Sequence, residues 1–197
     1  MTHFQGQSLP HFDLSSLPPR EAKIPQGLSF KIGWFYPKYL NLYGDRGNVE
    51  ILAVRAKLRG IPVEIVEIDL HTPFDSATLQ DINLIFMGGG PDLDQQQIYK
   101  DFLDNKGPYL KEYLSTGGTG LFICGSYQLL GNYYKSADGT TLEGLRFLDF
   151  YTEHYGKKKP RSIGNISVEL NPLLQSDPVF INNDLSLIHI SEPTRPY

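Results

Sequence analysis

Short apolar runs alternate with longer, more polar stretches through residues 31–134 of the chain. The apolar runs read KIGWFY (31–36), PVEIVEI (62–68), INLIFMGGG (82–90) and GLFICG (120–125). They are typical of strands, whereas the residues between them predict helices over 49–60, over 98–114 with an interruption at Gly107–Pro108, and over 126–134. Strands that alternate with helices predict an α/β fold, with a mostly parallel sheet and helices on both faces.

The carboxyl ends of parallel strands share one edge of the sheet, and open α/β sheets place their chemistry there. The residues that follow the predicted strands at this edge are 36–48, 88–92 and 124–128. Functional side chains are therefore expected in these three loops. After Leu145 the pattern changes to LRFLDFYTE and NISVEL, which predicts antiparallel or edge strands.

The two ends of the chain differ in texture from its middle. Residues 1–30 contain four prolines and no apolar period, which predicts a flexible extension. Residues 185–195 read LSLIHISEPTR, which resembles the in-frame translation of a transposase-type sequencing-library adapter. The alternative is a natural apolar strand with a polar terminus. We expect an incomplete folded domain over 31–184, with the C-terminal part of the fold missing, and adapter read-through over 185–197.

Composition narrows the class of protein. The chain has 197 residues and a net charge of −4, from 18 Lys and Arg against 22 Asp and Glu, which argues against a nucleic-acid partner. Its single cysteine excludes an internal disulfide framework and a cysteine-rich zinc site. Because the sequence has no long apolar run and no signal-peptide pattern, we expect a cytoplasmic protein without a membrane span. No cofactor and no metal are predicted.

The sharpest chemical feature is Cys124, which ends an apolar run directly before a predicted helix. A turn between a strand and a helix exposes a nucleophile, and the partial positive charge of a helix N-terminus favours the thiolate. Gly125 permits the tight turn and offers a backbone N–H beside an oxyanion. The alternative is a buried structural cysteine, which is common in protein cores.

The segment MGGGPD (87–92) strengthens the catalytic interpretation of Cys124. A glycine loop at the end of a neighbouring strand can direct backbone N–H groups at a carbonyl oxygen, so Gly89 and Gly125 are predicted to form an oxyanion hole. The segment lacks the sequence patterns of nucleotide-phosphate loops. A plain turn remains the other interpretation.

A cysteine hydrolase also needs a base, usually a histidine. The natural candidates are His3, His11, His71 and His154. Each is interpreted as a surface histidine, so the base is either His154 or absent from this chain, and His189 falls within the adapter-like residues. The basic segment KKKPR (157–161) is typical of a solvated turn, although one arginine there could clamp a small carboxylate.

Four segments together resemble the cobyric-acid-synthase-like class I glutamine amidotransferases, and among them the GatD-type glutaminase subunits of lipid II isoglutaminyl synthase. They are YPKYLNLYGDRGNV (36–49), FMGGGPDLDQ (86–95), LFICGSYQLLG (121–131) and LEGLRFLDFYTE (142–153). Each segment alone is a weak signal, and their combination is specific. The similarity spans residues 31–183.

The resemblance implies a glutaminase. Cys124 would attack the side-chain amide of L-glutamine, ammonia would leave, and water would resolve the glutamyl thioester to glutamate. N–H groups around Gly89 and Gly125 would hold the oxyanion, while Arg161 and Gln128 match residues that bind substrate or belong to the nucleophile turn. The ammonia would pass to a MurT-like Mur ligase subunit that amidates the D-glutamate of lipid II during peptidoglycan synthesis.

The sequence departs from the family pattern at two places. Ser126 stands where the family motif CGGYQ has a glycine. The family's catalytic histidine lies beyond a GFENHGGRT-like segment that this chain does not contain, so we expect the chain to be inactive or severely impaired. The alternatives are a glutaminase of a cobyrinate or cobyric acid amidation system, a non-catalytic scaffold of the same fold, and another cysteine hydrolase.

Overall fold

The structure is a computed structural model that describes residues 27–42, 44–154 and 194–196. The chain divides into two compact units, with the boundary between Tyr127 and Gln128. Cys124 and both predicted oxyanion glycines belong to the first unit.

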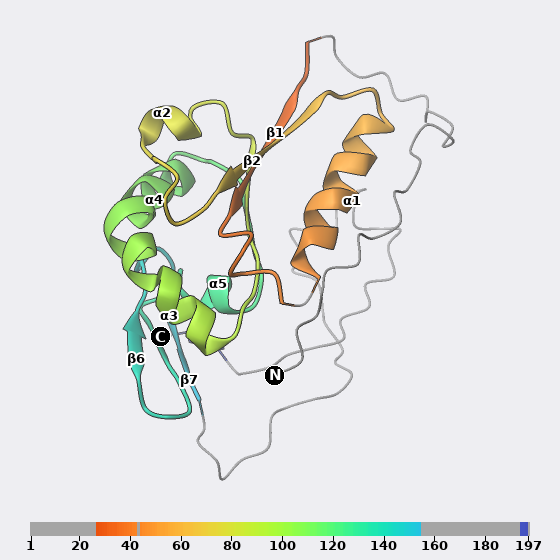
Figure 1. The fold of residues 1–197 in the computed structure, drawn as a ribbon. Coiled ribbons are helices and arrows are strands. Elements are labelled where there is room, and N and C mark those ends of the chain that lie inside the picture. Colours follow the sequence, from red (N-terminus) through yellow and green to blue (C-terminus); the bar gives the residue numbers. More distant parts are fainter. Residues whose placement is uncertain (1–26, 43, 155–193, 197) are drawn as a thin grey trace. The chain divides into compact units, whose positions relative to one another are not determined.

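Four parallel strands form the sheet of the first unit (Figure 1). They are β1 (Phe30–Phe35), β2 (Val63–Ile68), β3 (Leu84–Met87) and β4 (Gly120–Phe122), in the order β2-β1-β3-β4. Strand β1 pairs with β2 and β3, and β3 pairs with β4, all in parallel. Each of the four apolar runs supplies one strand, so the predicted parallel sheet is confirmed.

The strand order reverses between β1 and β3. The chain passes from β1 outward to β2 and then crosses back to β3 on the other side of β1. In open parallel sheets, ligands bind beyond the carboxyl ends of the strands at such a reversal. The segments that leave β1 and β3 there are the loop before α1 and the glycine loop 88–90.

Helices cover both faces of this sheet, as predicted (Figure 1). On one face lies α1 (Asp45–Lys57). On the other lie α2 (Ser76–Leu79) and α4 (Gly107–Ser115), which contact each other. Alternate residues of β1 pack on the two faces of the sheet, because successive side chains of a strand point in opposite directions.

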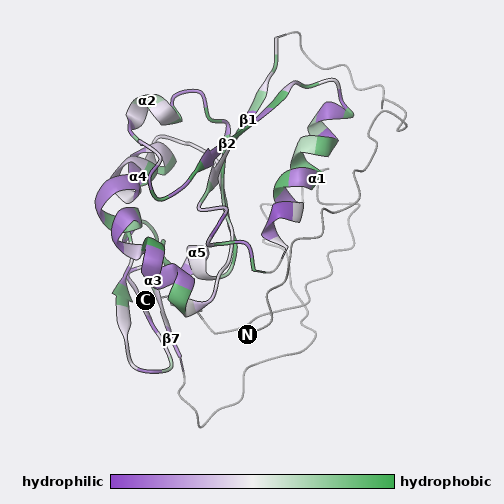
Figure 2. Cartoon of the chain, viewed as in Figure 1, coloured by the Kyte–Doolittle hydropathy of each residue, from purple (hydrophilic) through white to green (hydrophobic). Residues whose placement is uncertain are grey.

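The face of β1 toward α1 buries Ile32 and Trp34 together with Val49 of that helix. On the opposite face, Phe35 meets Phe74 edge to face, with 5.3 Å between the ring centroids. Figure 2 shows hydrophobic and hydrophilic residues mixed along α1, as expected of a helix with one buried side.

The helix predicted over 98–114 is longer than expected and changes type rather than breaking. It consists of α3 (Asp92–Asp101), a π-helical turn η2 (Phe102–Lys106) and α4. Pro108, near the start of α4, has no N–H to donate and its ring disfavours a regular preceding turn. The wider π turn before it accommodates the proline, so the predicted interruption is a local widening of the helix.

Two further helices differ from the prediction. Helix α1 begins at Asp45 rather than at residue 49, because Gly44 adopts a left-handed φ of 79° that turns the loop into the helix. Helix α5 (Gly125–Gln128) is one turn long, and the predicted continuation to residue 134 is wrong. The backbone amide of Asn132 instead donates a hydrogen bond of 2.7 Å to Phe150 O, and the residues that follow form a strand.

The second unit is a small mixed sheet. It contains β5 (Tyr133–Lys135), β6 (Thr141–Glu143), β7 (Phe150–Glu153) and β8 (Thr194–Pro196), in the order β6-β5-β7-β8. Strand β5 pairs antiparallel with β6 and parallel with β7, and β7 pairs antiparallel with β8. The sequence LRFLDFYTE, expected to form an antiparallel or edge strand, supplies β7, for which one of the two pairings is antiparallel. The segment NISVEL lies outside the described residues.

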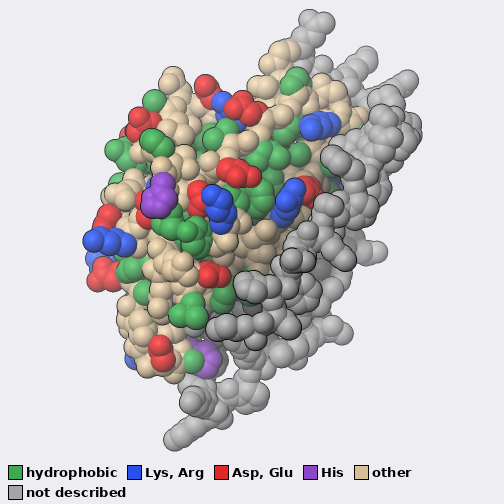
Figure 3. Space-filling view, in the orientation of Figure 1, with side chains coloured by type: hydrophobic (Ala, Val, Ile, Leu, Met, Phe, Trp, Pro, Cys, Tyr) green, Lys and Arg blue, Asp and Glu red, His purple; other side chains and the backbone are tan. Residues whose placement is uncertain are grey.

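None of the described helices is both long enough and apolar enough to cross a membrane. Acidic and basic side chains are interspersed over the face seen in Figure 3, without a large patch of one sign.

Candidate active site

Cys124 occupies a strained turn between β4 and α5. Its φ is 54°, in the left-handed region that residues other than glycine seldom adopt, and the residue is exposed. Such strain concentrates at functional sites, and a strand–turn–helix that presents an exposed nucleophile is the arrangement predicted from the sequence. The interpretation of Cys124 as a buried structural cysteine is therefore wrong.

Ser126 holds this turn against strand β3 through hydrogen bonds of its side chain. Its side chain is fully buried and its hydroxyl lies 2.7 Å from Met87 O, at the end of β3. Ser126 Oγ also accepts a hydrogen bond of 2.8 Å from the amide of Ile123. The serine that departs from the family motif thus points into the sheet edge and bonds the turn to the neighbouring strand.

The glycine loop 88–90 is buried and closely packed against the loop that follows β1. A methyl group placed on Gly88 would lie 2.2 Å from Leu40 O and 2.8 Å from the side chain of Asp45. One placed on Gly90 would lie 2.8 Å from the side chain of Leu40. Glycine is needed at both positions because the two loops approach within the radius of a β-carbon.

The register of the sheet brings the glycine loop beside Cys124. Met87 and Phe122 are partners in the β3–β4 ladder, and Ile123 N donates to Met87 O at 3.0 Å. The residues that follow these partners, Gly88 onward and Cys124 onward, therefore leave adjacent strands at the same edge. Two of the predicted site segments are together in the fold.

Gly89 and Gly125 carry the two backbone N–H groups that the sequence predicts for an oxyanion hole. Both residues are buried, and neither amide donates a hydrogen bond to any group in the described part of the chain. Buried N–H groups without a protein partner are rare, and an oxyanion hole is one kind of site that contains them. The carbonyl of Gly89 points elsewhere, because it accepts from Leu42 N at 3.3 Å.

The sequence YGDRGN, in the loop 36–48 where functional side chains were predicted, also reaches this edge. Asp45, its acidic residue, is 1% exposed and lies against Gly88. It is also the first residue of α1, where a carboxylate complements the helix dipole. Tyr43 lies outside the described residues.

A second buried polar group at the same sheet edge was not predicted. Tyr36, which follows β1 with a φ of 51°, donates its hydroxyl to Asp101 Oδ2 at 2.9 Å. Lys106 of the π turn forms an ion pair with the same carboxylate, and its Nζ lies 5.4 Å from the centroid of the Tyr36 ring. No sequence signal joins these residues, because Tyr36 is distant in the chain from the other two.

The ionisation of this cluster follows from its contacts. Burial, with the negative charge of Asp101 as the next cause, raises the pKa of Tyr36 well above its ordinary value. Burial alone would raise the pKa of Asp101, but hydrogen bonds from Lys106, Asn105 and Tyr36 outweigh it and hold that pKa below the ordinary value of 3.8. Tyr36 is thus a neutral donor to a carboxylate anion.

The other predicted site residues are placed as follows. Gln128 is the last residue of α5 and the first of the second unit, and it is half-buried. His71 is exposed, and the backbone amide of His154 donates to Lys135 O at 2.8 Å. Outside the described residues lie Arg161, His3, His11 and His189.

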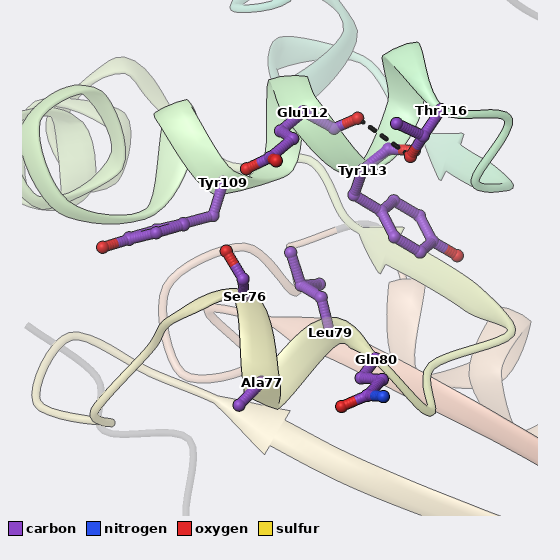
Figure 4. A pocket seen from close by; sticks show the side chains of 8 residues that line it. All are labelled: Ser76, Ala77, Leu79, Gln80, Tyr109, Glu112, Tyr113 and Thr116. Carbon is purple, nitrogen blue, oxygen red and sulfur yellow. Dashed lines mark hydrogen bonds between the residues drawn. The ribbon is translucent and has the colours of Figure 1, made fainter.

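An open groove of about 530 Å³ lies away from the predicted site, between α2 and α4 (Figure 4). It is lined on one side by Leu79 and its neighbours and on the other by Tyr109 and Tyr113, and none of its lining residues belongs to the loops discussed above. Within the residues that can be described, no group of three or more His, Cys, Asp or Glu side chains could hold a metal ion.

Comparison with known proteins bears on this site. Residues 31–179 match the sequence profile of the CobB/CobQ-like glutamine amidotransferase domain. Over 135 residues the chain is 44% identical to the GatD subunit of the glutamine-hydrolyzing lipid II isoglutaminyl synthase of Staphylococcus aureus (strain N315), which covers 68% of this chain and 53% of that protein.

The corresponding GatD subunit of Streptococcus pneumoniae (strain ATCC BAA-255 / R6) is 34% identical over 154 residues, which are 78% of this chain and 56% of that protein. A cobyric acid synthase of Vibrio campbellii (strain ATCC BAA-1116) is 29% identical over 120 residues, 51% of this chain and 25% of the synthase. The chain spans about half the length of the two GatD relatives. The resemblance inferred from the four motifs is confirmed.

Proposed function

Because the chain belongs to the CobB/CobQ-like glutamine amidotransferase domain family, we propose that it is the nucleophile-bearing part of a glutaminase subunit that hydrolyses L-glutamine. The observation that carries this proposal is the exposed, left-handed Cys124 beside the buried loop 88–90 with its open N–H groups. A thiol, a tight turn and two convergent donors are what acyl transfer from an amide requires.

The reaction proceeds in two steps. The thiolate of Cys124 forms a bond to the side-chain carbonyl carbon of glutamine, and the carbonyl oxygen becomes an anion that the N–H groups of Gly89 and Gly125 stabilise. The C–N bond then breaks and ammonia leaves with one added proton. Water attacks the resulting thioester, which releases glutamate and returns the thiol.

Arg161 and Gln128 are proposed to bind the substrate, since they match the positions that serve this purpose in the family. The base that assists both steps is proposed to lie in a part of the full-length protein outside this sequence, because the GatD relatives are about twice as long as the matched stretch. The chain as it stands is then expected to form the thioester slowly and to turn over poorly.

The released ammonia is proposed to pass to a MurT-like Mur ligase subunit, which amidates the D-glutamate of lipid II in peptidoglycan synthesis. Support comes from the two GatD relatives, whose names place them in lipid II isoglutaminyl synthase, at 44% and 34% identity. A second candidate is a glutaminase for cobyrinate or cobyric acid amidation. It is supported by the similarity to cobyric acid synthase, which is weaker, at 29% identity.

The test is covalent labelling of the purified chain with an electrophilic diazoketone analogue of L-glutamine. We expect one adduct, at Cys124, whose formation L-glutamine slows and D-glutamine does not. The Cys124→Ala variant is expected to take up no label, since it is the only cysteine in the chain.

Two outcomes oppose the proposal. Labelling that L-glutamine leaves unchanged would favour the scaffold or another cysteine hydrolase. Ammonia release by this chain at the rate of a complete GatD protein would show that the base lies within residues 1–184. Addition of a MurT-like ligase is expected to yield amidated lipid II only with a chain that completes the hydrolysis.

A further inference from the structure

Gln95 is buried at the point where the glycine loop and the cysteine turn meet. It is the first of three consecutive glutamines in α3, and its side chain is 3% exposed, whereas Gln96 and Gln97 are exposed. Its position in the helix is set by a backbone hydrogen bond of 3.0 Å from its own N–H to Pro91 O. Three residues of one type thus occupy two different environments, and only one faces the site.

One side chain contacts both halves of the proposed oxyanion hole. Gln95 Nε2 donates a hydrogen bond of 2.9 Å to Gly90 O. A methyl group placed on Gly125 would lie 2.2 Å from Gln95 Nε2 and 2.6 Å from its carbonyl carbon. The side-chain amide of Gln95 therefore packs against the backbone of Gly125 and donates a hydrogen bond to the carbonyl of Gly90.

The amide is retained at a cost in stability. Gln95 Oε1 is buried and has no hydrogen-bond partner in the described part of the chain. A buried acceptor without a partner lowers the stability of the fold. Packing alone therefore does not explain why a glutamine stands at this position.

We infer that Gln95 is a positioning residue, which fixes the spacing and direction of the Gly89 and Gly125 N–H groups through its contacts with Gly90 and Gly125. This inference rests on the proposed glutaminase function. An oxyanion hole works only when its donors are aimed at the developing charge, and small displacements of a reacting group lower the rate strongly. Holding both donor-bearing segments with one side chain removes their independent motion.

The experiment measures labelling of Cys124 by the glutamine diazoketone and, in parallel, by iodoacetamide, which needs no oxyanion hole. Unfolding of each variant by urea is followed through Trp34, the only tryptophan. The variants are Gln95→Met, which keeps length and removes both polar atoms, and Gln96→Ala, which is the exposed neighbour and serves as the matched control.

We expect Gln95→Met to unfold close to the urea concentration of the unchanged chain, because removal of the orphaned Oε1 offsets the loss of the hydrogen bond from Nε2 to Gly90 O. Its diazoketone labelling should fall about 10-fold to 100-fold relative to its iodoacetamide labelling. Gln96→Ala should change neither rate. A purely structural role predicts the opposite pattern: lower stability and an equal fall, or no fall, in both labelling rates.

A second pair of variants tests the contact itself. Gly125→Ala places its methyl group against the Gln95 amide, and it should lose stability and diazoketone labelling. Adding Gln95→Ala to Gly125→Ala should restore stability, since it removes the colliding atoms, but should not restore labelling. Additive losses of stability in the double variant would overturn the inferred contact.

The outcomes separate the two proposals. If L-glutamine fails to protect the unchanged chain from the diazoketone, the glutaminase proposal fails, and the inference about Gln95 fails with it. If L-glutamine protects the unchanged chain but Gln95→Met is labelled at the unchanged rate, only the role of Gln95 is overturned.

Discussion

Two buried polar groups lie at the carboxyl edge of the same parallel sheet, and they differ in how their atoms are satisfied. Beside β1, Tyr36, Asp101 and Lys106 form a closed network in which the carboxylate accepts from both partners. Beside β3 and β4, the N–H groups of Gly89 and Gly125 and Oε1 of Gln95 have no partner among the described residues.

The difference separates structure from chemistry. A fully satisfied polar network makes the fold rigid, and its groups are too well occupied to act on a substrate. Orphaned donors and acceptors lower the stability of the fold, so each needs an explanation, and beside an exposed cysteine the binding of a ligand is the one we favour. The cluster of Tyr36, Asp101 and Lys106 contains the charged groups, yet the glycine loop 88–90 is the better candidate for catalysis.

The largest expected effect comes from opening the closed network. Asp101→Asn leaves the ammonium of Lys106, whose side chain is 1% exposed, without its counter-charge. We expect a loss of about 3 kcal/mol in the free energy of unfolding at neutral pH. Urea denaturation followed through Trp34, which is 6% exposed in the core, measures it. A loss below 1 kcal/mol would show that the network is not closed.

The pH dependence of this loss has a definite sign. The pKa of Asp101 is lowered in the folded protein, so its contribution to stability is present above the ordinary value of 3.8 and is lost as pH falls through the lowered value. The difference between the unchanged chain and Asp101→Asn should therefore shrink under acid. A difference that grows as pH falls would contradict the assignment of the anion to Asp101.

Gly88→Ala should have the next largest effect. The new methyl group would lie 2.2 Å from Leu40 O, a backbone atom that no side-chain rotation can move. We expect a loss of about 2–3 kcal/mol and slower diazoketone labelling of Cys124. The matched control is Gly47→Ala in α1, where a methyl group meets nothing within 4 Å and should be neutral or slightly stabilising. Equal effects of the two variants would refute the close approach of the loops.

Ser126→Ala should have a smaller effect. It removes the hydroxyl that bonds the cysteine turn to Met87 O and Ile123 N, and Met87 O still accepts from Ile123 N. We expect a loss of about 1–2 kcal/mol. Iodoacetamide should react faster with Cys124 in this variant, because the turn is less firmly held. Unchanged stability and reactivity would show that the serine is a neutral replacement for the family's glycine.

The smallest effect is expected at a charged pair on the surface. Lys31 and Glu64 join β1 to β2 at 3.2 Å, and the carboxylate side chain is 62% exposed. Glu64→Gln should change the free energy of unfolding by less than about 0.5 kcal/mol, since water screens the pair. Comparison with Asp101→Asn isolates burial as the variable, and a similar loss in both variants would remove the basis of the contrast.

The sequence predicted the elements of the first unit well and their boundaries less well. The apolar runs identified all four strands because buried parallel strands are nearly continuous in apolar residues. Helix α5 was predicted too long, since Tyr133 and its neighbours fit a helical period as well as a strand. The short helix α2 was missed, although Asp75 is of a residue type that is preferred at helix N-caps.

For the site, the order of residues along the chain was enough to single out Cys124, Gly89 and Gly125. A thiol or glycine at the end of an apolar run has few structural uses, so local sequence carries that information. Gln95 is the last residue of the segment FMGGGPDLDQ, and nothing in the local sequence distinguishes it from Gln96 and Gln97. Its role depends on contact with Gly90 and Gly125, and the latter lies across the sheet edge from it.

By itself, the sequence determined the order of strands and helices, the membership of the family and the candidate nucleophile, because each depends on residues that are close together in the chain. Only the tertiary structure decided which polar atoms are satisfied and which are left open. That distinction depends on distances between segments far apart in sequence, such as Tyr36 with Asp101 and Gly125 with Gln95. Burial then sets its energetic weight, since a missing hydrogen bond is costly only where water cannot replace it.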